Sequence, residues 1–156
     1  MRIALAAVII ALVVFYFFTQ ANNSKAAKEN IAKGSAFLAE NAKREGVVQT
    51  LSGLQYEVLT KGENTEHPSA TSNVTVHYHG TLIDGTVFDS SVERGQTIDF
   101  PLNRVIPGWT EGVQLMSVGD KFRFYIPSQL AYGNRSTGKI EGGSVLIFDV
   151  ELFAIN

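Results

Sequence analysis

The sequence predicts an α+β domain of antiparallel strands around one short helix, preceded by a hydrophobic helix and a short helical stalk. Several segments alternate apolar and polar residues with a period of two, as strands with one buried face do. These segments are residues 54–59, 74–82, 121–127 and 145–156. One segment of about ten residues, beginning at Trp109, instead has helical spacing. A length of 156 residues without an internal repeat is typical of a single domain.

The composition excludes several classes of site. The chain has no cysteine, so disulfides, thiol catalysis and cysteine-based zinc sites are excluded. Thirteen basic and 15 acidic residues give a net charge of −2, which gives no indication of a nucleic-acid partner. His77 and His79 share one face of a predicted strand, but no cysteine and no clear carboxylate accompany them. We therefore expect no metal site.

The first segment, residues 1–21, is a candidate membrane anchor. Residues 3–18 carry no charge, and residues 3–21 approach the length needed to cross a hydrocarbon layer of about 30 Å. A cleaved signal peptide is the alternative. We favour the uncleaved anchor because bulky aromatics at residues 15–18 occupy the region where a cleavage site needs small residues. The expected location is the inner membrane with the domain in the periplasm, or a soluble periplasmic protein after cleavage.

Residues 22–46 predict a helical stalk between this segment and the folded domain. They are rich in alanine, lysine, glutamate and asparagine. Ala27, Ile31, Ser35 and Leu38 form only a thin apolar stripe, so we expect the helix to be solvated and to end at Gly46. Residues 47–156 then form the folded domain.

The first strands of the domain include a predicted hairpin. Residues 54–59 alternate as a strand, and a polar turn region follows them. In the next strand, Val74, Val76 and Tyr78 point to one side, and the two histidines point to the other. Asp84-Gly85 predicts a tight turn. A second apolar pair, Val87-Phe88, leads into Asp89-Ser90-Ser91, whose short side chains favour another turn.

The second half of the domain contains the short helix and two more strands. Pro107 suits the first turn of a helix that places Trp109, Val113 and Met116 on one face and ends near Gly119. The strand that follows has alternate apolar residues, and a glycine- and serine-rich loop at residues 133–144 separates it from the last strand. The inward side chains of these two strands are expected to be Phe122, Phe124, Ile126, Leu146, Phe148, Val150 and Leu152.

Residues 74–109 have the composition of an apolar pocket. They combine aromatics, aliphatics, one aspartate after Phe88, and the only tryptophan of the chain. Any one of these aromatics taken alone is more often an ordinary core residue. Asp89 can likewise be a turn former ahead of two serines. Only their joint spacing favours a pocket.

Four motifs in order resemble the FKBP family of peptidyl-prolyl cis-trans isomerases, most closely its bacterial macrophage infectivity potentiator (Mip) branch. The motifs are HYHGTLIDGTVFDSS, RVIPGWTEGVQLMSVGDK, IPSQLAYG and LIFDVEL. The resemblance covers residues 47–156 and implies a curved antiparallel β-sheet half wrapped around a short α-helix. It also implies an enzyme that accelerates X-Pro bond rotation in exported, folding proteins, without a cofactor. Proline-containing polypeptides are its implied partners, and macrolides of the rapamycin type are implied ligands.

The same resemblance assigns the site residues. Asp89 would meet the carbonyl region of the substrate and would be held by Tyr78, while the Tyr132 hydroxyl would bond the carbonyl on the far side of the proline. Trp109 would form the floor of the pocket. The other implied substrate-binding residues are Phe88, Ile98, Phe100, Val105, Ile106, Ile140 and Phe148. Arg94 is a candidate partner of Asp89, with a solvated role as the alternative.

The predicted reaction needs neither a nucleophile nor a metal. Rotation about a peptide bond crosses about 18–20 kcal/mol, and no covalent bond breaks. A water-poor pocket favours the twisted amide, because twisting reduces its charge separation. Two alternatives stay open, namely a proline-binding chaperone or scaffold with little catalysis, and a membrane-anchored interaction module. The helices through which Mip proteins dimerise lie upstream of the matched segment, so we expect a monomer.

Overall fold

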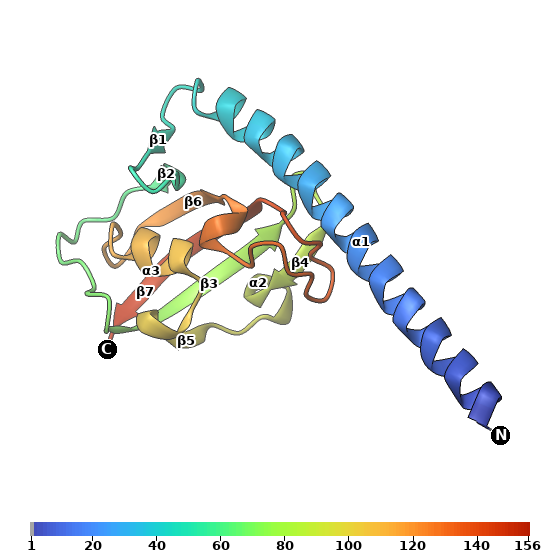
Figure 1. The fold of residues 1–156 in the computed structure, drawn as a ribbon. Helices are drawn as coiled ribbons and strands as arrows, with labels where there is room; N and C mark the ends of the chain where they lie inside the picture. The colour runs from blue at the N-terminus through green and yellow to red at the C-terminus, as the bar shows by residue number, and fades with distance from the viewer. Residues whose placement is uncertain (1) are drawn as a thin grey trace.

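The computed structural model describes residues 2–156, and describes side chains from Val8 onward. A long helix, α1 (Arg2–Asn41), lies beside a sheet domain, and its amino-terminal half extends beyond that domain (Figure 1). The other elements are β1 (Val48–Gln49), β2 (Gln55–Thr60), β3 (Asn73–Thr81), β4 (Val87–Ser90), α2 (Ser91–Arg94), β5 (Ile98–Pro101), the 3-10 helix η1 (Leu102–Arg104), α3 (Pro107–Val113), β6 (Lys121–Ile126), the 3-10 helix η2 (Ser128–Leu130) and β7 (Leu146–Ile155).

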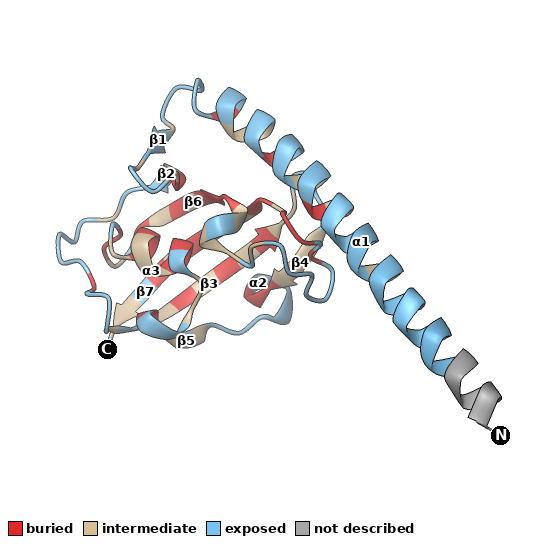
Figure 2. Ribbon diagram, viewed as in Figure 1, coloured by how far each residue is buried: buried red, intermediate tan, exposed pale blue. Residues whose placement is uncertain are grey.

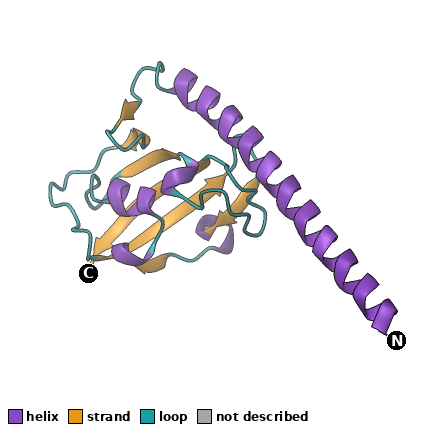
Figure 3. Ribbon diagram, in the orientation of Figure 1, coloured by secondary structure: helices purple, strands orange, loops and turns teal. Residues whose placement is uncertain are grey.

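The described strands, orange in Figure 3, form one antiparallel sheet. Their order in the sheet is β1-β2-β6-β7-β3-β4. Strand β5 also pairs with β3, so β4 and β5 share one edge of β3. The longest strands, β3 and β7, pair from Val74↔Ile155 to Thr81↔Ile147. The predicted α+β class with an antiparallel sheet is confirmed. Strands β1 and β5 were not predicted, because neither is long enough to show an alternating pattern.

The inner face of the sheet carries the core that the alternation predicted. The inward side chains of β3, β6 and β7 are buried, whereas most of the outward ones are only partly so (Figure 2). Gly85 has a φ of 90°, as the turn predicted at Asp84-Gly85 requires. The expected inward residues of the last two strands, from Phe122 to Leu152, are all in the core cluster.

Helix α3 packs closely on the inner face. Its axis can approach β6 because two glycines face the strand. A Cβ on Gly108 would lie 2.5 Å from Cγ2 of Ile126, and one on Gly112 would lie 2.6 Å from Cε1 of Phe124. Trp109 is buried on the predicted face. The helix nevertheless ends before Gly119, because tight turns replace α-helical hydrogen bonds after Val113.

The helix predicted for residues 22–46 is present as the second half of α1, but one face of it packs on the domain instead of being solvated. Ala27, Gly34 and Asn41 are buried at intervals of seven residues, which places them on one face of the helix. A Cβ on Gly34 would lie 2.7 Å from Cγ2 of Val145, so helix and domain are in close contact. The helix also ends at Asn41, and Gly46 belongs to the turn that follows.

No helix in the described part of the chain is apolar over a sufficient length to cross a membrane. The expected membrane segment at residues 3–21 begins before the part of the chain whose side chains the structure describes. The side chains of its first residues, up to residue 7, lie outside the described part.

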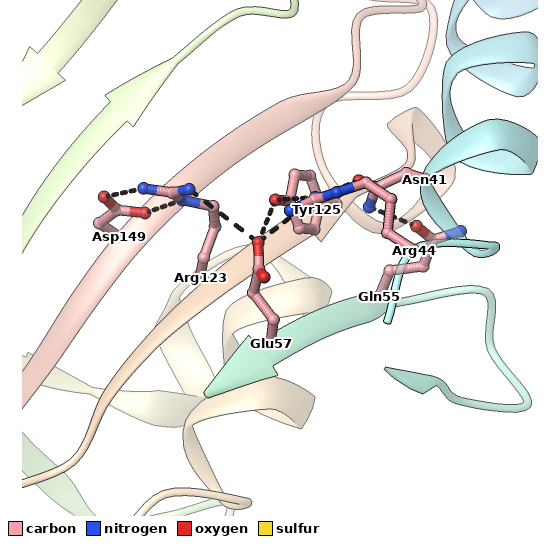
Figure 4. A network of polar contacts seen from close by, with 7 residues as sticks. All are labelled: Asn41, Arg44, Gln55, Glu57, Arg123, Tyr125 and Asp149. Carbon is pink, nitrogen blue, oxygen red and sulfur yellow. Dashed lines mark hydrogen bonds and ion pairs between the residues drawn. The ribbon is translucent and has the colours of Figure 1, made fainter. Parts of the chain in front are cut away.

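Buried amides attach the end of α1 to the sheet (Figure 4). Asn41 Nδ2 donates to Gln55 Oε1 at 2.8 Å, and Gln55 Nε2 donates to the Leu38 carbonyl at 2.8 Å. The Phe37 and Tyr125 rings lie 6.0 Å apart, centroid to centroid. The amide pair is satisfied internally, as buried polar groups need to be.

Charged groups continue this network across the outer face of the sheet (Figure 4). Arg44 Nη1 donates to the Tyr125 hydroxyl at 3.0 Å, and that hydroxyl donates to Glu57. Arg123 makes a bidentate pair with Asp149, with distances of 2.6 and 2.9 Å. Burial, followed by the hydrogen bond to Glu57, raises the pKa of Tyr125, so its hydroxyl stays protonated as a donor.

Candidate functional site

The inner side of the domain holds a cavity of about 440 Å³ beside α3. Aromatic and aliphatic side chains form most of its wall, with one carboxylate and one guanidinium among them. The lining residues are Tyr78, Asp89, Phe100, Arg104, Val105, Ile106, Trp109, Tyr132 and Phe148. They come from β3, β4, β5, η1, α3, β7 and the segments beside η1 and η2. A largely apolar hollow with a few convergent polar groups is typical of a ligand site.

Trp109 lies at the centre of the aromatic wall. Its indole is 4% exposed, and three lining rings meet it edge-on. The centroid distances are 5.4 Å to Tyr78, 5.4 Å to Phe100 and 5.3 Å to Phe148. Such edge-to-face pairs add about 0.5–1.5 kcal/mol each beyond the area they bury. The indole is therefore held rigidly, as a pocket floor must be.

A charged cluster forms one rim of the cavity. The Tyr78 hydroxyl donates to Asp89 Oδ2 at 2.5 Å. Arg94 donates to Asp89 Oδ1 and to the Tyr78 hydroxyl, the second at 3.0 Å. Of the two roles considered for Arg94, pairing with Asp89 is the one the structure has. The aspartate thus holds the tyrosine against the cavity and is itself held by the arginine.

Opposing effects set the pKa values in this cluster. Burial alone would raise the pKa of Asp89, but the hydrogen bonds from Tyr78 and Arg94 outweigh burial and lower it. Burial and the bond to Asp89 raise the pKa of Tyr78, although Arg94 partly opposes them. At neutral pH, Asp89 is therefore ionised and Tyr78 is a neutral donor.

A local turn explains why Arg94 returns to Asp89. Ser90 caps helix α2, because its hydroxyl accepts from the Glu93 amide at 3.2 Å. Gly95 ends the helix with a φ of 70°. The single turn of helix between these caps carries Arg94 back over the carboxylate.

The two strand histidines support that turn from the outer face. His79 Nδ1 lies 2.8 Å from Ser90 Oγ, and His77 Nδ1 lies 2.7 Å from Ser91 Oγ. Ser91 Oγ also accepts from the Tyr78 amide at 2.8 Å. Among the described residues, no group of His, Asp or Glu side chains is arranged to hold a metal ion.

Tyr132, which follows η2, also lines the cavity and is 43% exposed. Its hydroxyl makes no hydrogen bond to any residue that the structure describes. The backbone beside it is fixed, since the amides of Ala131 and Gly133 donate to the Ser128 carbonyl at 2.9 and 2.8 Å. A fixed residue with an unengaged hydroxyl can donate to a ligand.

Three of the predicted substrate-binding residues do not line the cavity. Phe88 contacts Phe148, with the two ring centroids 5.3 Å apart and the rings edge-on. Ile98 pairs with Val76 and is only partly buried. Ile140 is 7% exposed and belongs to the core cluster. Their part in substrate binding stays a prediction.

The sequence reasoning missed Arg104, which lines the cavity. It is the last residue of η1, a 3-10 helix that the sequence did not predict. Its position directly before Val105 and Ile106, which were predicted to bind substrate, could have indicated Arg104 as a cavity residue. These two aliphatics line the same cavity.

Two family models match the chain. The model described as FKBP-type peptidyl-prolyl cis-trans isomerase matches residues 64–153. The model described as the domain amino-terminal to FKBP-type peptidyl-prolyl isomerase matches residues 9–58. Together they cover the cavity, the sheet and most of α1.

Named proteins are similar over most of the chain. An FKBP-type peptidyl-prolyl cis-trans isomerase FkpA from Aeromonas hydrophila is 60% identical over 88% of this chain and 51% of its own length. The outer membrane protein MIP of Legionella longbeachae is 46% identical over 85% of this chain and 57% of its own length. The chain thus spans about half the length of the curated relatives it matches.

The fold also matches a solved structure. The crystal structure of FkpA from Escherichia coli superimposes with a TM-score of 0.84 at 40% identity, over 94% of this chain and 71% of that one. Because the overlap covers nearly the whole chain, it includes α1 as well as the sheet domain.

Proposed function

Because the chain belongs to the family of FKBP-type peptidyl-prolyl cis-trans isomerases, we propose that it accelerates X-Pro bond rotation in folding polypeptides. The observation that carries the proposal is the cavity with Trp109 as its floor and three aromatic rings meeting it edge-on. The intact set of cavity residues favours an enzyme over a chaperone or an interaction module on the same fold.

The aromatic wall supplies the main catalytic effect. A proline ring seated on the indole of Trp109 brings its amide into surroundings that exclude water. The planar amide loses solvation there, while the twisted amide loses less because its charge separation is smaller. This difference in lost solvation free energy lowers the barrier, which is about 18–20 kcal/mol without a catalyst.

Two polar groups orient the bound chain. The ionised Asp89 faces the carbonyl region of the residue before proline and keeps Tyr78 in the wall. Tyr132, which also lines the cavity, donates its hydroxyl to the carbonyl after proline. No proton transfer is needed, so neither residue has to change its protonation state.

A prolyl isomerisation assay on the 156-residue chain tests the proposal. We expect Trp109→Ala to lower kcat/KM by about 10-fold or more, because it opens the floor to water. Asp89→Ala should also lower it. Phe153→Ala is the control, since Phe153 is an exposed aromatic on β7 that lies outside the cavity. A macrolide of the rapamycin type should compete for the same cavity.

The assay also separates the alternatives. If the wild-type chain binds unfolded, proline-containing protein without accelerating isomerisation, the protein is a chaperone or scaffold. If it does neither, the pocket is vestigial and the interaction module is the better interpretation. Each of these outcomes would contradict the enzyme.

We propose that the domain works in the periplasm as a monomer. A relative named as an outer membrane protein supports a place in the cell envelope. Attachment through residues 3–21 and cleavage of that segment are the two routes to this place, and cell fractionation with protease protection distinguishes them. Sedimentation of the purified chain measures its oligomeric state.

A further inference from the structure

We propose that α1 positions the Tyr132 side of the cavity through the loop of residues 133–145, and that Asn30 is a positioning residue for isomerisation. The inference rests on the proposed function, and it adds a role for a helix outside the catalytic fold. Figure 1 shows α1 passing beside this loop, which is drawn in orange-red.

Asn30 makes direct contact with the loop. Its side-chain Nδ2 donates to the Gly142 carbonyl at 3.0 Å and to Glu141 Oε2 at 3.1 Å. Both bonds join residues more than 110 positions apart in the chain. One amide therefore binds the backbone and a side chain of the loop at once.

Close packing beside Asn30 leaves little room for the loop to shift. Ala27 is 3% exposed, and a Cβ on Gly143 would lie 2.3 Å from the Ala27 carbonyl oxygen. Two turns after Ala27 along α1, Gly34 meets Val145. The small side chains of α1 thus let its backbone lie against the loop.

Backbone hydrogen bonds carry this contact to Tyr132. The Gly143 amide donates to the Gly133 carbonyl at 2.8 Å, and the Gly133 amide donates to the Ser128 carbonyl at 2.8 Å. Gly133 is the neighbour of Tyr132, which lines the cavity. The path from Asn30 to Tyr132 therefore has three steps. Asn30 binds the Gly142 carbonyl, the next amide binds the Gly133 carbonyl, and Gly133 is joined to Tyr132 by one peptide bond.

Within the loop, Thr137 and Ile140 exchange backbone hydrogen bonds and Ile140 is buried in the core, so the contacts with α1 add a second attachment at residues 141–145. Residues 134–139 are exposed, and Gly133, Gly138 and Gly143 all have positive φ values. Glycines make the unfolded loop entropically costly to order. The contacts with α1 at the far end of the loop offset that cost and hold the loop in one position.

Enzyme kinetics on two variants in α1 test the inference. Asn30→Asp keeps the size of the side chain but removes the donor, and Glu29→Gln on the exposed side of the helix is its control. We expect Asn30→Asp to lower kcat/KM by about 3- to 10-fold, mostly in kcat. The control should match the wild type.

A double-mutant cycle distinguishes positioning of Tyr132 from a general loss of stability. If Asn30 acts through the Tyr132 hydroxyl, Asn30→Asp should have little further effect in a chain that already carries Tyr132→Phe. Fully additive losses would overturn the inference.

A second pair of variants approaches the contact from the loop. Gly143→Ala and Gly138→Ala each place a Cβ at a positive φ, of 79° and 53° respectively. Only the first meets α1, because nothing lies within 4 Å of the Cβ position at Gly138. Gly143→Ala should lower kcat and speed hydrogen exchange of the amides at 133–145, whereas Gly138→Ala should change both much less.

The outcomes separate this inference from the proposed function. An inactive wild-type chain would overturn the proposed function, and this inference with it. An active wild type whose Asn30→Asp and Gly143→Ala variants keep full kcat/KM would overturn the inference alone.

Discussion

The carboxylate of Asp89 is already engaged before any substrate binds. Tyr78 and Arg94 both donate to it, and the pKa of Asp89 is lowered as a result. Asp89 is therefore a fixed charge that orients its neighbours, and the proposed reaction needs no proton from it. Protonation would remove the charge that holds Arg94 in place.

The activity should therefore be insensitive to pH around neutrality. Because the pKa of Asp89 lies below its ordinary value of about 4, kcat/KM should stay constant between about pH 6 and 8 and fall only in strong acid. A pH profile of kcat/KM measures this. An acid limb with a midpoint above about pH 5 would contradict it, and Asp89→Asn should lack the acid limb altogether.

The carboxylate of Asp120 is held by donors from two loops. It is fully buried, accepts from the amides of Gly62 and Ser117, and pairs with Lys61 at 3.0 Å. Burial would raise the pKa of Asp120, but these donors outweigh it and lower the pKa. One residue thus joins the end of β2 to the turn before β6.

Asp120→Asn should destabilise the fold by about 2–4 kcal/mol, because a neutral amide cannot accept from every donor that surrounds it. A lowered folded-state pKa means that the unfolded chain binds the proton more readily. The stabilisation from Asp120 is therefore present above its unfolded pKa and is lost as the pH falls through its folded pKa. Urea unfolding from pH 7 to 3 measures both effects. The exposed variant Glu63→Gln is the control. If Asp120→Asn loses as much unfolding free energy between pH 7 and 3 as the wild type does, that loss does not come from Asp120.

At the scale of elements, the single turn of α2 depends on its caps. The Ser90 hydroxyl accepts from the Glu93 amide and contacts His79, so Ser90→Ala removes the cap and leaves a histidine nitrogen without its partner. We expect a loss of about 1–2 kcal/mol in unfolding free energy, together with a lower kcat/KM because Arg94 moves. Ser90→Thr keeps the hydroxyl and should preserve both. Wild-type activity in Ser90→Ala would show that α2 does not position the cluster.

Close approach of α3 to the sheet makes its glycines intolerant of substitution. In an ordinary helix, Gly→Ala stabilises by up to about 1 kcal/mol. Here the new Cβ at Gly112 would lie 2.6 Å from Phe124. We expect overpacking to prevail, with a net loss of about 1–3 kcal/mol. Phe124→Leu in the same chain should recover part of the loss, and a stabilised single variant would contradict the packing.

Periodicity made the sheet and the short helix predictable. The alternation that begins at Val74 is a local property, and so are the turn at Gly85 and the helical spacing after Trp109. The docking of α1 was not predictable, because Ala27 and Gly34 are too small to give a hydrophobic stripe. Because these residues are small, the loop at residues 143–145 can approach α1 closely, and that loop is distant in the sequence.

Most residues of the cavity, like most of the sheet, could be predicted from the sequence. Most of the pocket residues come from motifs with a recognisable spacing, and the cavity brings together side chains as distant as Tyr78 and Phe148. Arg104 escaped because a 3-10 helix has no distinctive periodic pattern. Ile140 was expected at the pocket; it is buried beside the turn between Thr137 and Ile140, and its part in substrate binding stays a prediction.

At the scale of the whole molecule, α1 and the sheet domain form one packed unit. Asn41 lies buried at the junction, bonded to Gln55. Asn41→Ala leaves the Gln55 oxygen without its donor, so we expect a loss of about 1–3 kcal/mol. Hydrogen exchange of the amides at 27–41 should quicken as the helix detaches more often. Glu40→Ala, on the exposed side of α1, is the control, and unchanged exchange in Asn41→Ala would mean that other contacts suffice.

The position of β7 has a consequence for biosynthesis. This strand follows every other strand in the chain, yet it lies between β6 and β3 in the middle of the sheet. On the ribosome, the earlier strands must wait with their apolar sides unpaired until residues 146–155 emerge. A protein that we propose to help folding polypeptides past slow steps thus itself receives a central strand of its sheet last, after the other described strands.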